Sequence, residues 1–177
     1  MTVGYIIGQT LGILGFTCMF LSYQSKRNSL LFIFQGLVGF FFALNYYLIG
    51  DMSASLFNIV VLIRGFILSQ SKKRLWEVIV LEVLFTACFI FSLTKIWGVW
   101  LDVALSCLTF STLIIMTIIM WKANAKHIRF AQLFYVSPVW LTNNIIHFTP
   151  GGVLCEILAM SSVVVSFIRY GKNGFEQ

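Results

Sequence analysis

The distribution of basic residues along this chain constrains its fold more than any other feature. Ten of the twelve Lys and Arg residues lie in every second gap between hydrophobic stretches or in the C-terminal tail. The other gaps hold one basic residue, Lys95, together with Asp51 and Asp102. Loops that alternate in this way follow the positive-inside rule of membrane proteins. The pattern therefore predicts seven transmembrane helices, with the N-terminus outside the cell and the C-terminus in the cytoplasm.

Composition agrees with lipid as the main solvent of the chain. Hydrophobic residues make up 59% of the sequence and charged residues only 10%, whereas a soluble domain carries roughly 25% charged residues. Seven spans of about 20 residues each use nearly the whole chain and leave no room for a soluble catalytic domain. The net charge of +6 gathers at span ends, which favours contact with anionic lipid headgroups and excludes a nucleic-acid partner.

The hydrophobic stretches predict where the spans lie and how they group. The expected spans are about Gly4–Ser22, Ser29–Ile49, Ser53–Gln70, Leu75–Thr94, Val99–Trp121, Ile128–Phe148 and Gly152–Arg169. A unit of three spans ends on the opposite side from its start, so one extra span is needed before a second unit can repeat its orientation. We expect an all-α integral membrane protein in which residues 1–72 and 98–177 form two parallel three-helix units. Residues 73–97 are then the linker span.

Polar residues inside the spans predict a binding cavity. A shift of 98 residues aligns the two units without gaps, and it matches Asn45 with Asn143 and Asn58 with Glu156. All four lie roughly 6–8 Å below the outer edge of the apolar core. Because polar groups are costly at this depth, they suggest a shared site for a small solute. Trp140, three residues before Asn143, offers a ring for stacking on such a solute.

Two explanations of these four residues are open. In the first they line a cavity, and the carboxyl of Glu156, which needs a proton or a cation there, indicates a cationic solute or coupling to protons. In the second they form hydrogen bonds between helices and simply hold the bundle together. Such bonds are each worth about 0.6 kcal/mol on average in a membrane protein.

The stretch Ala43–Arg64 resembles the YgjV family of bacterial inner-membrane proteins. In that family a second span that ends in glycine leads to a run of small residues, then to an Asn and to an Arg six residues later. The matching residues here are Gly50, Ser53, Ala54, Asn58 and Arg64, and further matches near the C-terminus are Trp140, Asn144, Gly151, Gly152, Glu156 and Ile168–Arg169. The resemblance extends over essentially the full length of the chain.

The resemblance implies a fold and a function. The family is grouped with SWEET, SemiSWEET and PQ-loop proteins, whose units are three-helix bundles, so a SWEET-like carrier of the inner membrane with alternating access is expected. Carriers of this kind bind cargo with an Asn on the third helix of each unit, where Asn58 and Glu156 stand here. PQ-loop units usually carry Pro-Gln at the end of the first span, but this chain reads Tyr23-Gln24. That difference favours the alternative of a non-transporting structural, regulatory or lipid-binding protein.

Two charged residues are expected to meet on the cytoplasmic side. Arg64 and Glu82 lie nine residues before and after Lys73, so they have a similar depth of about 9–11 Å from that side. We expect them to form an ion pair or to face one polar pocket. The alternative is that Arg64 extends its long side chain to the cytoplasmic interface.

Flexible points and catalytic groups complete the predictions. Pro138 is in the middle of the sixth span, where proline usually kinks a helix. It acts either as a hinge, together with Gly12 and Gly15, or as a static kink. No phosphate-binding loop, catalytic carboxylate pair or nucleophile motif is present, which argues against an enzyme. The four cysteines and two histidines lack the spacing of metal ligands, so no metal or cofactor is expected. The expected partners are membrane lipids and a small polar or cationic solute.

Overall fold

The computed structural model describes residues 3–70, 74–96, 98–122, 125–146 and 150–171, and within these ranges it contains helices and no strand. The helices are α1 (Val3–Gln24), α2 (Asn28–Ile49), α3 (Met52–Ser69), α4 (Leu75–Ile96), α5 (Trp100–Trp121), α6 (Ala125–Ala131), the π-helical segment η1 (Gln132–Val136), α7 (Ser137–Ile146) and α8 (Pro150–Tyr170). Since α6, η1 and α7 follow one another without a gap, the described chain forms seven helical rods, in agreement with the seven expected spans.

Five of these helices are long and apolar enough to cross a membrane, by length and composition. They are α2, α3, α4, α5 and α8. In α1 the described apolar stretch Thr10–Gln24 is shorter, and the rod Ala125–Ile146 is divided into three segments. An apolar chain in lipid must satisfy its backbone hydrogen bonds internally, which explains why nearly every described residue is helical. The expectation of a helical, multi-span membrane protein is therefore confirmed.

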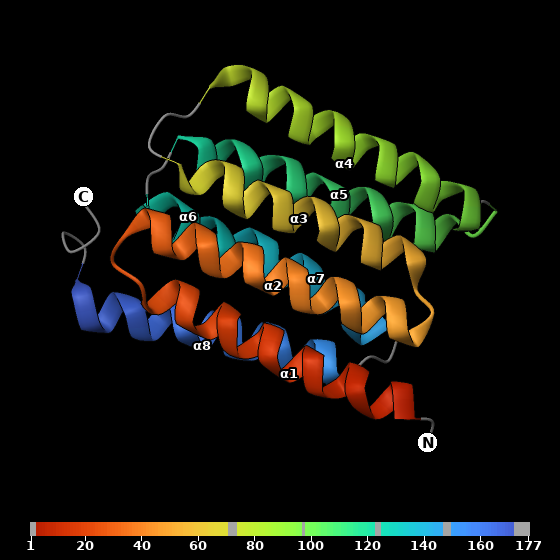
Figure 1. Ribbon diagram of the computed structural model, residues 1–177, viewed down its shortest axis with the longest axis horizontal. Helices are drawn as coiled ribbons and strands as arrows, with labels where there is room; N and C mark the ends of the chain where they lie inside the picture. The colour runs from red at the N-terminus through yellow and green to blue at the C-terminus, as the bar shows by residue number, and fades with distance from the viewer. Residues whose placement is uncertain (1–2, 71–73, 97, 123–124, 147–149, 172–177) are drawn as a thin grey trace.

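Successive rods run in opposite directions, and the two termini lie at opposite ends of the bundle (Figure 1). The last residues of α1, α3, α5 and α8 lie at one end, which we call the basic end. Lys26, Arg27, Arg74 and Lys122 all belong to this end. Lys72, Lys73 and Lys172 fall outside the described residues. The opposite end holds Gly50 and Asp51 between α2 and α3.

The first three helices pack closely because glycines let their backbones approach. A Cβ atom on Gly39 of α2 would lie 2.5 Å from the backbone nitrogen of Leu62 and 2.6 Å from the carbonyl oxygen of Asn58, both on α3. Gly65 of α3 faces the backbone of Gly36 in the same way. Small residues at such positions are typical of helix pairs in membranes. At these glycines the contact of α2 with α3 is thus made by backbone, without intervening side chains.

The two trios of helices meet through their outer members. In the first trio α2 lies between α1 and α3, and in the second the rod α6–η1–α7 contacts both α5 and α8. Helix α1 contacts α8, and α3 contacts α5. Helix α4 lies at the edge of the bundle, against α3 and α5 (Figure 1). A hydrophobic core that includes Phe32, Leu81 and Met120 fills the space between these helices.

The sixth rod has an irregular segment directly before the proline that is expected to kink it. A π-helical segment, Gln132–Val136, comes directly before Ser137 and Pro138, and the backbone N–H of Ser137 donates to the carbonyl oxygen of Gln132. Proline has no N–H, and its ring would clash with the carbonyl group four residues earlier. The wider turn relieves this conflict and rotates the helix that precedes it. Segments of this kind are often found at functional sites.

Candidate functional site

Six buried polar side chains form a continuous cluster between the two trios. These residues, which we call the polar chain, are Ser22, Tyr23, Gln35, Gln132, Ser137 and Glu156. They come from α1, α2, η1, α7 and α8. None is more than 9% exposed. Buried polar groups of this number require partners, and the partners here are one another.

The hydrogen bonds of the polar chain run from the first trio into the second. The Gln35 amide nitrogen donates to Ser22 Oγ and to Tyr23 Oη, at 3.1 Å in both cases. Tyr23 Oη donates to Gln132 Oε1 at 2.6 Å. The Gln132 amide nitrogen then donates to Ser137 Oγ at 2.9 Å. Because Ser137 accepts this bond, its own proton is free to point at another acceptor.

Glu156 of α8 lies at the end of the polar chain. Its carboxyl group is close enough to the Ser137 hydroxyl for the two side chains to interact. The Oε2 atom of Glu156 is buried and has no hydrogen-bond partner. No Lys or Arg in the described part of the chain pairs with this carboxyl. An acidic group left in this state has capacity for a proton or a cation.

Arg129 fixes the end of α1 that carries Tyr23. This side chain is fully buried. Its Nη2 atom donates to the carbonyl oxygens of Tyr23 and Ser25, at 2.9 and 2.6 Å, and its Nε donates to Ser166 Oγ of α8 at 3.2 Å. The carbonyl groups at a helix C-terminus lack partners within the helix, and a guanidinium is a suitable donor for them. Arg129 therefore joins α1, α6 and α8 at the basic end.

Further hydrogen bonds join α1 to α8 at the same end. The Gln24 amide nitrogen donates to the carbonyl oxygen and the hydroxyl of Ser162, at 2.8 and 3.0 Å. The Ser162 hydroxyl donates to the carbonyl oxygen of Phe20. The Tyr170 hydroxyl donates to the carbonyl oxygen of Gln24 at 2.8 Å, and the ammonium of Lys26 lies 4.9 Å from the centre of the Tyr170 ring. The basic end of the interface between the trios is thus closed by polar contacts.

Among the residues expected to bind a solute, the two asparagines of the first trio bind backbone. Asn45 is buried, and its amide nitrogen donates to the carbonyl oxygen of Gly8 on α1. Asn58 is half-buried and donates to the carbonyl oxygen of Ala54, one turn earlier in α3, at 2.8 Å. Each of these bonds uses one of the two N–H donors of the side-chain amide.

Two expected residues of the second trio, Trp140 and Asn143, lie on the same helix as Ser137. Trp140 follows Ser137 on α7, and its indole N–H donates to Thr112 Oγ1 of α5 at 3.1 Å. Asn143 is half-buried on the same helix and has interaction partners. Of the residues expected to share a cavity, Glu156 is the one that joins the polar chain.

The expected hinge residues lie at helix contacts. Gly12 and Gly15 are within the unbroken helix α1. A Cβ on Gly12 would lie 3.2 Å from the amide nitrogen of Asn45, and one on Gly15 would lie 3.1 Å from Cβ of Phe41. Pro138 begins the regular helix after the π segment. A role in motion stays a prediction for all three.

Arg64 and Glu82 are not joined by a hydrogen bond. Arg64 is buried; its Nη1 atom donates to Thr117 Oγ1 of α5 at 3.3 Å, and its guanidinium lies 5.7 Å from the centre of the Phe85 ring. Both carboxylate oxygens of Glu82 are buried without a hydrogen-bond partner. The two groups are close enough to interact electrostatically. Arg64 therefore stays inside the bundle and does not reach the interface.

Sequence reasoning missed most of the polar chain. It placed Arg129 among the basic residues of a loop, whereas the structure buries this side chain in a helix. Gln35 and Gln132 stand inside hydrophobic stretches, which is a usable signal for function. Their meeting through Tyr23 depends on the contact of α1 with η1, which no local pattern encodes.

The sequence matches a known protein family over nearly its whole length. The model of the family Imp-YgjV, described as a bacterial inner membrane protein, matches residues 6–174. No curated protein matches the chain, and no solved structure does.

Proposed function

This chain belongs to the Imp-YgjV family of bacterial inner membrane proteins, and we propose that it carries a small polar or cationic solute across that membrane. The contacts between trios support two units of like orientation. The first helix of one trio faces the last helix of the other at α1 and α8, and the same holds at α3 and α5. A two-fold axis along the membrane normal produces this reciprocal pairing, which is the arrangement of carriers with parallel repeats.

The single observation that carries the proposal is the state of Glu156. Its carboxyl is buried beside Ser137 at the end of the polar chain, and its Oε2 atom has no hydrogen-bond partner. Such a group inside a membrane protein typically marks a path for a solute or proton. A solute with a positive charge or a hydrogen-bond donor would complete the coordination of Oε2.

Other expected residues have supporting roles in this proposal. Trp140 and Asn143 lie on α7 beyond Ser137, where they would contact the part of the solute that extends away from Glu156. Asn45 and Asn58 would contribute their side-chain oxygens. The polar contacts between α1 and α8 at the basic end would keep the cytoplasmic side closed. These contacts would break when the solute is released. The basic end is assigned to the cytoplasm, and the N-terminus to the periplasm, by the positive-inside rule.

The test is a thermal-shift screen of the purified protein with two groups of compounds. Choline, thiamine and nicotinamide riboside are the cations, and glucose and uridine are the neutral compounds. We expect at least one cation to raise the melting temperature of the wild type, since a ligand at about 100 times its Kd stabilises by about 2.7 kcal/mol. Glu156→Gln should abolish the shift, and Glu156→Asp should retain part of it. Uptake of the same cation into proteoliposomes should follow the same order.

A non-transporting role is the second candidate, and one observation favours it. One pocket lies beside α4 and another lies beside Pro138. Neither pocket includes a residue of the polar chain. In a structural or lipid-binding protein the polar chain would only hold the trios together. Glu156→Gln would then lower stability without changing the response to any compound, and no compound would enter proteoliposomes. That result would refute the carrier.

A further inference from the structure

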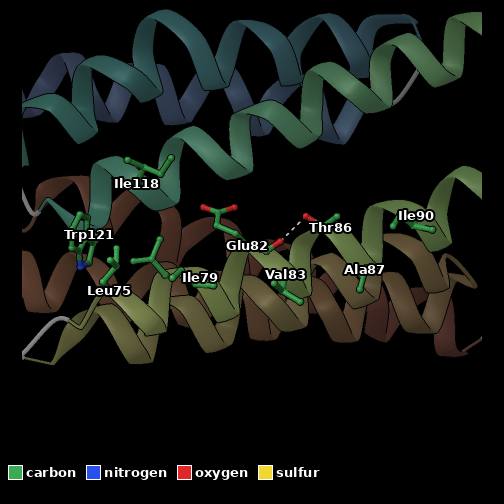
Figure 2. A pocket seen from close by; sticks show the side chains of 10 residues that line it. Leu75, Ile79, Glu82, Val83, Thr86, Ala87, Ile90, Ile118 and Trp121 are labelled. Atoms are coloured by element: carbon green, nitrogen blue, oxygen red, sulfur yellow. Dashed lines mark hydrogen bonds between the residues drawn. The ribbon is translucent and has the colours of Figure 1, made fainter.

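A groove between α4 and α5 forms a second candidate site, separate from the polar chain. Its volume is about 670 Å³, which is in the range of pockets for small molecules. The residues that line it are Leu75, Val78, Ile79, Glu82, Val83, Thr86, Ala87, Ile90, Ile118 and Trp121. Figure 2 shows that Glu82 extends from α4 into the space towards α5.

The groove opens to the surroundings of the bundle. Ile79, Val83 and Ile90 are each more than half exposed, and α4 lies at the edge of the fold, where α3 and α5 are its main neighbours among the described helices. In a multi-span membrane protein this face meets lipid. A molecule that enters the groove must therefore come from the membrane and must have a hydrocarbon body.

Glu82 supplies the one acidic group of the groove. Neither carboxylate oxygen has a hydrogen-bond partner, although both are buried. The hydroxyl of Thr86 donates to the backbone oxygen of Glu82 and not to its carboxylate. Arg64 of α3 interacts electrostatically with this carboxylate, but its hydrogen bond goes to Thr117, and its guanidinium carbon lies 5.7 Å from the centre of the Phe85 ring. The carboxylate thus lies at the groove without a hydrogen-bond donor from the described part of the chain.

We propose that this groove binds a single-chain amphiphile that carries a protonated amine. The ammonium donates to the carboxylate of Glu82, and the hydrocarbon chain lies along Ile79, Val83 and Ile90. Glu82 stands seven residues after the first residue of α4, about 10 Å from that end of the helix. To reach Glu82, the headgroup of a phospholipid would have to move about that far from the membrane interface into the apolar region. This favours a small single-chain amine over an aminophospholipid. The site is independent of the proposed function.

The experiment uses the full-length protein in phosphatidylcholine nanodiscs and a dodecylamine that carries a photoreactive diazirine on its chain. Labelled peptides are mapped by mass spectrometry at increasing probe concentration, with the matching alcohol as a comparison. Labels are expected on α4 and near Ile118. Glu82→Gln should weaken apparent affinity about tenfold or more, because a charge-assisted hydrogen bond is lost. Glu82→Asp should restore part of it.

Two further variants separate the groove from general effects. Ala87→Phe fills the groove and leaves the carboxylate in place, so it should also prevent labelling. Asp102→Asn removes a carboxyl from the far end of α5 and should label like the wild type. The proposal is overturned if Glu82→Gln, eluting as folded protein, binds the amine as tightly as the wild type, or if the alcohol labels equally well. It is also overturned if phosphatidylethanolamine in the nanodiscs displaces the probe, since a lipid amine then holds the site.

Discussion

Arg129 provides the sharpest test of how the two trios are joined. Arg129→Met keeps a long, flexible side chain but removes all donors. The carbonyl oxygens of Tyr23 and Ser25 and the hydroxyl of Ser166 then lose hydrogen bonds of 2.9, 2.6 and 3.2 Å. The bond from Nη1 to the carbonyl oxygen of Ala125, within the same helix, is lost as well. We expect α1 to loosen from α6 and α8 at the basic end.

The expected loss of stability in Arg129→Met follows from the hydrogen-bond acceptors that are left without donors. Two backbone carbonyls of another segment lose a charged partner, and each buried unsatisfied group costs about 1–3 kcal/mol. Removal of the buried guanidinium also removes its desolvation penalty, which offsets part of this loss. We therefore expect a decrease of about 2–4 kcal/mol in the free energy of unfolding. For a chain of this length the decrease corresponds to about 5–15 °C in melting temperature, on the scale of soluble domains.

The assay is thermal unfolding in detergent, followed by intrinsic fluorescence. Lys122→Met is the matched control, because it also removes one positive charge near the basic end, from a side chain that is exposed. A surface change of this kind alters stability by about 0.5 kcal/mol or less. If Arg129→Met and Lys122→Met unfold at the same temperature, the hydrogen bonds of Arg129 do not join the trios and the reasoning fails.

Two other predictions concern packing and orientation. Gly39→Ala places a methyl group against the backbone at Leu62, so it should lower the free energy of unfolding by about 1–3 kcal/mol. Gly12→Ala is the control, because its methyl group meets only the end of a side chain, and it should lower stability clearly less. Equal melting temperatures of the two variants would contradict the backbone contact. In a variant without the native cysteines, a cysteine at Asp51 should react with a membrane-impermeant maleimide added to intact spheroplasts, whereas a cysteine at Ser25 should react only after lysis; the reverse order would invert the assigned orientation.

The helices could be predicted from the sequence because the membrane leaves few alternatives. An apolar run of about 20 residues must satisfy its own backbone hydrogen bonds, and a helix does so. The third span was expected at Ser53–Gln70 and is found at Met52–Ser69. The sixth span was expected as a kinked helix at Pro138. The structure adds a π segment before it, because the conflict around proline is resolved by the preceding backbone.

The candidate site could be predicted only in part. It depends on the rotation of each helix about its axis and on contacts between residues that are distant in sequence. Depth along a helix follows from residue counting, and this placed Arg64 and Glu82 at a similar level. The direction of each side chain about the helix axis depends on packing, and here Thr117 of α5 takes the hydrogen bond of Arg64. Tyr23 and Gln132 are 109 residues apart, and only the folded arrangement of the trios brings them together.

The glycine contact of α2 with α3 makes the two halves of the protein mechanically unequal. At Gly39 and Gly65 the helices touch backbone to backbone, so neither can slide or turn without a steric clash. The corresponding rod of the other half has a widened turn beside a proline, where fewer backbone bonds resist bending. A change of shape would therefore be a movement of the C-terminal half against a stiff N-terminal half, and cross-links within the latter should leave that movement intact.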